Sequence, residues 1–125
     1  MKALFKILIA SKLTYCLLVS SIVHADVQPE QIKEVNHLLS FVEHSGCTIN
    51  RNGTDHPAEK GISHIQKKYD YFRDDIDNTE EFIEYSATKS TMSGNYYMVT
   101  CPGKQAIRTQ DWLMTELKRF RAEKN

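Results

Sequence analysis

Apolar residues recur at helical spacing in four stretches of the chain. The pattern predicts helices over residues 29–44 and 57–75, a short helix through Phe82, and a last helix from Thr109. The apolar stripes consist of Ile32, Val35, Leu38, Leu39 and Val42; of Ala58, Ile62, Ile65, Tyr69, Phe72 and Ile76; of Phe82, Ile83 and Tyr85; and of Trp112, Leu113, Met114, Leu117 and Phe120. Each helix therefore has one face to bury.

Two short runs, residues 47–50 and 96–101, are rich in the aromatic and β-branched residues that favour strands. Residues 51–57 follow the first run and are dense in turn formers, among them the turn signal Asn52-Gly53. We therefore expect an α+β fold in which about four helices pack on a small two-stranded β-ribbon. Such a ribbon is marginal alone, so helix packing has to stabilise it.

Local signals mark the helix ends. Asp55 is a candidate N-cap for the second helix, and Asp77 and Glu80 have the spacing of a capping-box variant. Gly61 lies at the edge of the second apolar stripe, where glycine costs about 1 kcal/mol relative to alanine. We expect another segment of backbone to approach the helix closely at this position.

The first 25 residues have the order of a secretory signal peptide. Basic residues precede an apolar, uncharged run over residues 13–23. The segment Val23-His24-Ala25, which has the small or apolar residues of a cleavage site, then leads into a polar segment. The run is too short for the ~20 residues that span a bilayer. We expect cleavage after Ala25, with an uncleaved anchor as the alternative. Residues 26–125 would then form a single periplasmic or secreted domain without a membrane span.

The net charge depends on this leader. The whole chain has 16 basic and 16 acidic residues. Cleavage removes three basic residues and no acidic one, which leaves a formal charge of −3 on the mature domain. A mildly acidic domain lacks the broad positive field that nucleic-acid binding uses, and we exclude nucleic acid as a partner.

Two cysteines remain in the mature chain, Cys47 and Cys101. An even count in an exported protein predicts a disulfide, and pairing of the strand-like runs beside them would let the sulfurs approach. The alternatives are a reactive thiol or a metal ligand, but neither cysteine has a CxxC neighbour or a histidine at ligand spacing. His37 and His44 are too far apart along the first helix to share a metal, and we expect both to be solvated. We predict no metal and no cofactor.

Polar residues that could bind a partner gather around the second helix. One flank of this helix carries Lys60, His64, Lys67, Lys68 and Tyr71, and the other carries Glu59, Asp70 and Asp74. With the neighbouring loop and strand, the first flank predicts a binding surface of Arg51, Asn52, His56, His64, Tyr71, Tyr96 and Tyr97. The structural alternative is that Arg51 and His64 make buried hydrogen bonds that fix the ribbon to the helix.

A catalytic alternative draws on nearby residues. The candidate nucleophiles are Ser63, Ser90 and Ser93, the bases are His56 and His64, and the acids are Asp55 and Glu59. A triad needs these groups within hydrogen-bond reach, and the sequence has neither a nucleophile elbow nor a zinc-protease spacing. We assign no catalytic residue and keep a small periplasmic hydrolase that acts on cell-wall material as the alternative function.

Several short sequence motifs resemble those of a known family, and they follow in the same order along nearly the whole mature chain. They are Cys47-Thr48-Ile49-Asn50-Arg51-Asn52-Gly53, Ala58, His64-Ile65-Gln66-Lys67-Lys68-Tyr69, Thr79-Glu80-Glu81-Phe82-Ile83, Ser90-Thr91-Met92-Ser93-Gly94-Asn95-Tyr96-Tyr97, Cys101-Pro102-Gly103 and Trp112-Leu113. Together they resemble the YfeK-like family, small exported bacterial proteins of unknown function. Tyr96 and Gly61 depart from it, since Pro and Ala are common there.

The resemblance implies export to a bacterial periplasm and brings no known activity, cofactor or catalytic residue. Taken with the candidate surface, it leads us to expect a non-catalytic binding or interaction module of the bacterial cell envelope. The expected partner is an envelope protein or a glycan, because an exported domain shares its compartment with both.

Overall fold

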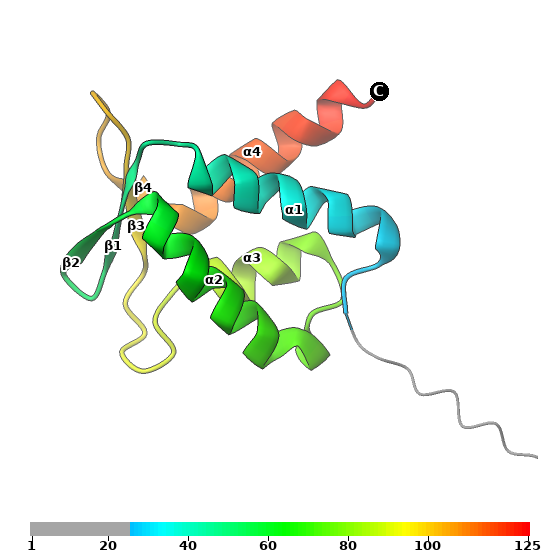
Figure 1. The fold of residues 1–125 in the computed structure, drawn as a ribbon, viewed down its shortest axis with the longest axis horizontal. Coiled ribbons are helices and arrows are strands. Elements are labelled where there is room, and N and C mark those ends of the chain that lie inside the picture. The colour runs from blue at the N-terminus through cyan, green and yellow to red at the C-terminus, as the bar shows by residue number, and fades with distance from the viewer. Residues whose placement is uncertain (1–25) are drawn as a thin grey trace, which may run out of the picture.

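A computed structural model describes residues 26–125, so the predicted leader lies outside the described residues. The helices are α1 (Pro29–Glu43), α2 (Ala58–Phe72), α3 (Thr79–Ala87) and α4 (Thr109–Glu123), and the strands are β1 (Thr48–Arg51), β2 (Thr54–Pro57), β3 (Met98–Thr100) and β4 (Ile107–Arg108). The sheet lies at one end of the packed helices (Figure 1). The α+β class and the four predicted helices are confirmed. No helix in residues 26–125 has the length and apolar character to cross a membrane.

The antiparallel sheet has four strands in the order β2-β1-β3-β4, two more than predicted. Asn52 and Gly53 have positive φ angles of 53° and 80°, as a tight hairpin turn requires. The chain therefore turns back after β1, and the residues that resembled a loop form β2. Asp55 lies in this strand and accepts a hydrogen bond from Asn50 at 2.8 Å. The prediction that Asp55 caps the second helix is wrong.

The predicted apolar stripes meet in one core between the helices. Its largest fully buried side chains include Phe82, Leu38, Ile76, Ile83, Leu113 and Leu117. Ile32 is the exception in the first stripe, because 41% of its surface is exposed in the first turn of α1. It lines a hollow between α1 and α2.

Two helix ends differ from the prediction. α2 ends at Phe72 and is followed by a 3-10 turn over Arg73–Asp75, within the range predicted as one helix. The N-cap of α3 is Asn78, whose side chain accepts a hydrogen bond from the Glu81 backbone N–H at 2.8 Å. The capping pair is thus shifted by one residue from Asp77 and Glu80, because Asn78 supplies the oxygen that reaches into the first turn.

The predicted disulfide between Cys47 and Cys101 is present. The two cysteines flank Thr48 and Thr100, which are paired across β1 and β3. The bond therefore joins the start of β1 to the end of β3 and closes a loop with a sequence separation of 54.

Side chains near the end of α4 bind the first helix. Arg121 Nε donates to Glu34 Oε2 at 2.6 Å, and Glu34 is buried. The His37 Nε2 atom lies 2.8 Å from Glu116 Oε1, and the His37 ring stacks on Phe120 with centroids 4.0 Å apart. The prediction that His37 is solvated is wrong, because this residue packs α1 against α4 with only 27% of its side chain exposed.

Gly61 marks the contact between α2 and the sheet. A Cβ atom at this position would lie 2.9 Å from Cδ1 of Ile49, which is closer than side-chain carbons approach one another. The prediction that another segment of backbone approaches here is wrong, because the group that packs against Gly61 is the Ile49 side chain of β1. This contact holds the inner face of the sheet against α2, where the candidate site lies.

Candidate functional site

The sheet register directs Arg51 and Tyr97 toward α2. Ile49 on β1 is paired with Val99 on β3, and both side chains are buried on the helix-facing side of the sheet. Side chains alternate between the two faces of a strand, so Arg51 lies on the same side as Ile49 and Tyr97 on the same side as Val99. Continuing the register places Arg51 opposite Tyr97.

α2 brings two basic side chains to this position. The His64 Nε2 atom lies 2.9 Å from the Tyr97 hydroxyl oxygen, and the two rings meet edge to face. Lys68 Nζ lies 5.2 Å from the centroid of the Tyr97 ring and donates to the Lys89 carbonyl at 2.6 Å. His64 and Lys68 are one helical turn apart, so both reach the same buried tyrosine.

Four basic residues lie near enough to His64 for their charges to act on it, and with His64 they form what we call the basic cluster: Arg51, His56, His64, Lys67 and Lys68. His56 lies on β2 opposite Ile49 and so projects to the same face of the sheet as Arg51. Burial, followed by the charges of Arg51, Lys68, Lys67 and His56, lowers the pKa of His64 to about 4. Burial and the charge of Arg51 also lower the pKa of Lys68. Positive groups are therefore held close together here.

No carboxylate of residues 26–125 forms an ion pair with Arg51, Lys67 or Lys68. The Nε–H of Arg51 is buried and has no hydrogen-bond partner among the described residues. A buried donor without a partner is costly, so the cluster is suited to accept an anionic group from outside the chain.

The turn beside Arg51 is tied to the segment that follows α3. Asn52 Nδ2 donates to Ser90 Oγ at 3.3 Å, and Ser93 Oγ donates to Asn52 Oδ1 at 2.7 Å. These contacts give Asn52 a positioning role and hold the two serines in the loop structure. None of the candidate nucleophiles Ser63, Ser90 and Ser93 hydrogen-bonds to His56 or His64, and nothing in this geometry favours the hydrolase.

The three predicted tyrosines of the binding surface are not grouped as expected. Tyr71 is 81% exposed and packs its ring edge to face against Phe72. Tyr96 lies beneath the guanidinium of Arg108 on the β4 side of the sheet, 3.9 Å from ring centroid to guanidinium carbon. Tyr97 is buried, so it supports the cluster from below and does not offer its ring to a partner.

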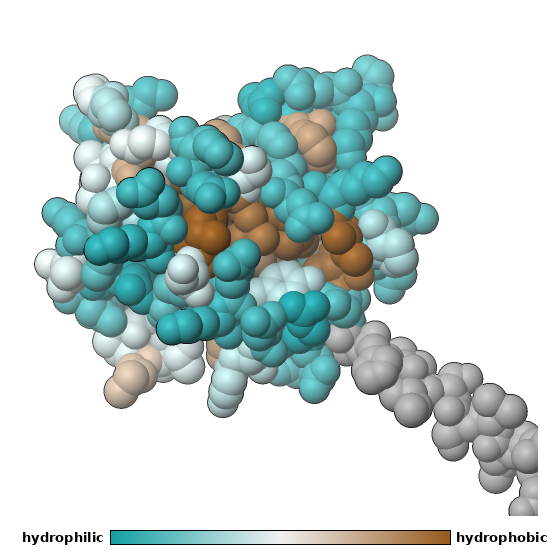
Figure 2. Space-filling view, in the orientation of Figure 1, coloured by the Kyte–Doolittle hydropathy of each residue, from teal (hydrophilic) through white to brown (hydrophobic). Residues whose placement is uncertain are grey.

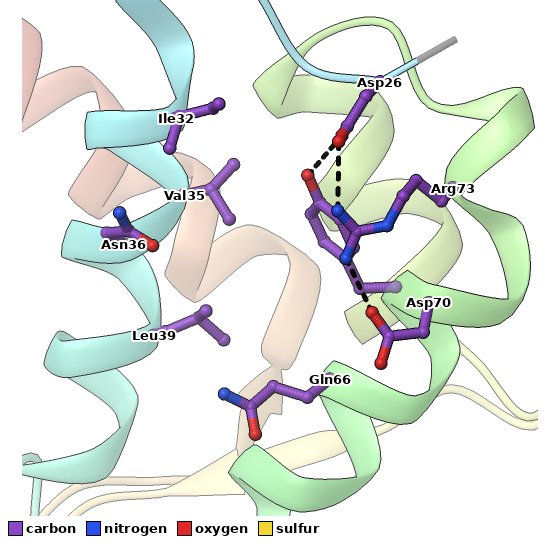
Figure 3. Close-up of a pocket in the computed structure, with 9 residues that line it drawn as sticks. Asp26, Ile32, Val35, Asn36, Leu39, Gln66, Asp70 and Arg73 are labelled. Carbon is purple, nitrogen blue, oxygen red and sulfur yellow. Dashed lines mark hydrogen bonds and ion pairs between the residues drawn. The ribbon is translucent and has the colours of Figure 1, made fainter. Parts of the chain in front are cut away.

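The hollow between α1 and α2 that Ile32 lines has a volume of about 320 Å³ (Figure 3). The apolar side chains of α1 form one wall, and they belong to the apolar patch that is visible in Figure 2 between hydrophilic surfaces. On the other wall Asp26 accepts hydrogen bonds from Tyr69 at 2.5 Å and Arg73 at 3.0 Å, and Arg73 also donates to Asp70. The carboxylates of Asp26 and Asp70 share the single guanidinium of Arg73, so each ionised group of this wall has a partner and the wall anchors the segment before α1.

No group of three or more His, Cys, Asp or Glu side chains in residues 26–125 is arranged to hold a metal ion. Of the buried polar side-chain atoms in residues 26–125 that lack a hydrogen-bond partner, Arg51 Nε is the one that belongs to a charged group.

Residues 29–121 match a family described as a family of unknown function, DUF5329. The chain belongs to this family. It is also similar to the uncharacterized protein YfeK of Salmonella typhimurium strain LT2, with 32% identity over 74 residues. That match covers 58% of this chain and 62% of the length of YfeK. No solved structure matches the chain.

These matches confirm the resemblance to the YfeK-like proteins that the sequence phrases indicated. Neither description states an activity, a ligand or a partner. Within this DUF5329 member, function therefore has to be argued from the site itself.

Sequence reasoning placed Lys68 on the basic flank but did not include it among the binding residues. Lys68 is 9% exposed, and its amine reaches over Tyr97 to the Lys89 carbonyl. The signal was the spacing of His64 and Lys68, which puts two basic groups on adjacent turns without a carboxylate between them. That spacing is typical of either a solvated face or an anion site.

His64 should make the stability of the protein pH-dependent. Its pKa is about 4 in the folded state, because of burial and the neighbouring cations, and its ordinary value is 6.5. The unfolded state therefore binds a proton that the native state does not, and stability present above pH 6.5 is lost as the pH falls through 4. Urea midpoints should fall more steeply over this range for the parent than for His64→Gln. Parallel curves would contradict the prediction.

Proposed function

We propose that this protein is a non-catalytic recognition module of the bacterial cell envelope, which binds an anionic group of its partner at the basic cluster. The observation that carries the proposal is the arrangement of Arg51, Lys67 and Lys68 without a carboxylate from residues 26–125. The buried, unpartnered Nε–H of Arg51 adds a donor that a ligand oxygen would satisfy.

The chemistry of the cluster favours a carboxylate or a phosphate as the bound group. The guanidinium of Arg51 presents several N–H donors in one plane, which matches the paired oxygens of such anions. Lys67 is exposed at the rim, whereas Lys68 is buried beneath. An incoming anion would relieve the repulsion among the cations and would bind more weakly as salt concentration rises.

Export to the periplasm or secretion is part of this proposal. The first 25 residues have the order of a signal peptide. The disulfide between Cys47 and Cys101 supports an oxidising compartment, since such bonds are rare in the cytosol. The proposed partner is an envelope protein or a glycan that carries acidic groups.

The test replaces Arg51 with glutamine and uses inorganic phosphate as the probe. In an NMR titration of the parent, we expect the largest amide shifts at His64 and Lys67. Arg51→Gln should weaken phosphate binding by about tenfold, which corresponds to one lost charge-assisted contact of about 1.4 kcal/mol. Arg108→Gln is the matched control, because Arg108 stacks on Tyr96 outside the cluster.

Two results would overturn the proposal. One is phosphate binding of equal strength in the parent and in Arg51→Gln. The other is the same loss of binding in Arg51→Gln and in Arg108→Gln, which would show a general effect of net charge. Thermal unfolding of each variant verifies that the fold is retained.

A further inference from the structure

A hollow of about 400 Å³ adjoins the basic cluster along α2. It lies between α2, α3 and the loop that follows α3, which appears beside α2 in Figure 1. Its lining consists of Lys68, Phe72, Glu84, Tyr85, Lys89, Ser90, Thr91 and Gly94. The volume lies in the range of small-ligand sites.

One wall of this hollow is aromatic. The rings of Phe72 and Tyr85 have centroids 5.4 Å apart and an angle of 35° between their planes. Tyr71 extends the row by packing edge-on against Phe72 at 4.8 Å. Tyr85 is 37% exposed and Tyr71 is 81% exposed, so aromatic surface faces solvent. Exposed aromatic side chains that lie together are typical of a binding surface.

The rest of the hollow is polar and continuous with the basic cluster. Lys68 belongs to both, and the loop that carries Ser90 and Thr91 is tied to Asn52, the neighbour of Arg51. Glu84 also lines the hollow, and its carboxylate accepts a hydrogen bond from Gln110 at 2.8 Å. The surface therefore changes from cationic to aromatic over about one to two turns of α2.

We propose that the basic cluster and the adjoining hollow between α2 and α3 together bind an acidic oligosaccharide. A sugar ring lies against Phe72 and Tyr85, and the acidic group of that sugar or of its neighbour lies at Lys68 and Arg51. This inference rests on the proposed function and specifies its ligand class. It enlarges the site beyond the basic cluster to the hollow between α2 and α3.

The shape and polarity of the surface favour a sugar over an acidic peptide. A pyranose ring has an apolar face of C–H groups. The hydrogens of these groups carry a partial positive charge, which the negative face of an aromatic ring attracts. Its rim of hydroxyls can meet the hydroxyl of Thr91 and the amine of Lys89 at the edge of the hollow. An acidic peptide without apolar side chains would make few contacts with the aromatic wall.

The experiment titrates the full chain, produced with its own leader, with three probes under NMR observation. They are trigalacturonate, its neutral methyl ester, and a tri-aspartate peptide. We expect trigalacturonate to bind at least tenfold more tightly than either of the others. Amide signals of Phe72, Tyr85, Thr91 and Gly94 should shift together with those of His64 and Lys67.

Two variants separate this hollow from the basic cluster. Thr91→Glu places a negative charge at the exposed rim without removing a packed side chain, and Tyr85→Ala removes half of the aromatic wall. Each should weaken trigalacturonate binding by tenfold or more while phosphate binding stays at the parental value. Thr100→Glu, on the outer face of the sheet, is the matched control and should leave binding of both probes unchanged.

The outcomes distinguish the two proposals. If tri-aspartate binds as tightly as trigalacturonate, or if Thr91→Glu has no effect, the oligosaccharide inference is overturned and anion binding at the basic cluster stands. If neither phosphate nor trigalacturonate shifts His64 and Lys67, both proposals fall. Thr91→Glu keeps the test valid even where Tyr85→Ala does not fold.

Discussion

Replacing both Cys47 and Cys101 with serine should lower the free energy of unfolding by about 4 kcal/mol. The disulfide closes a loop with a sequence separation of 54, and in the chain-entropy view a loop of this length restricts the unfolded chain by about that amount. The bond also joins β1 to β3, the two central strands of a sheet whose strands are two to four residues long. Urea unfolding followed by circular dichroism measures the change.

The parent in excess reductant is the control for this double substitution. Because both samples lack the same cross-link, their unfolding midpoints should agree. A difference below about 1 kcal/mol between the oxidised parent and the double variant would contradict the prediction. It would show that helix packing alone holds the sheet in place.

Replacing Phe82 with alanine should destabilise the protein by about 3–5 kcal/mol, because it removes a large side chain from the middle of the core. Phe82 is 1% exposed on α3, and its ring centroid lies 5.1 Å from that of Tyr69 on α2. The residue thus packs α3 against α2, and its truncation should leave a cavity that the surrounding side chains fill only in part. Chemical denaturation of the variant and the parent gives the difference in free energy.

Ile32→Ala is the matched control for Phe82→Ala. Ile32 lies in the first turn of α1 with 41% of its surface exposed, so its truncation leaves no enclosed cavity. We expect a loss below about 1 kcal/mol for this variant. Similar losses for the two substitutions would contradict the placement of Phe82 at the centre of the core.

The helices could be predicted from the sequence because their stripes are long and strongly periodic. The stripe through Ile65 and Tyr69, for example, is read from local spacing alone, and both side chains are buried. Strands β2 and β4 could not be predicted in this way. β2 contains Asp55 and Pro57, which are poor strand formers, and it exists because the Asn52-Gly53 turn pairs it with β1.

The candidate site was predictable by residue type but not by arrangement. Arg51, His64 and Tyr97 were all named as binding residues, yet their grouping depends on the register between β1 and β3. A shift of one residue would move Arg51 to the outer face of the sheet. The burial of Tyr97 and the separation of Tyr71 from the cluster follow from this tertiary geometry, which local spacing does not contain.

The two outer strands of the sheet limit how this protein can associate with itself. β4 has only two residues, and β2 carries the charged Asp55 and also Pro57, which has no N–H to offer a neighbouring strand. Such edges disfavour the addition of a strand from another molecule and so disfavour aggregation through the sheet. Other molecules should therefore bind through side-chain contacts and not through backbone pairing at the sheet edges. Even at high protein concentration, we expect no further strand to join the sheet.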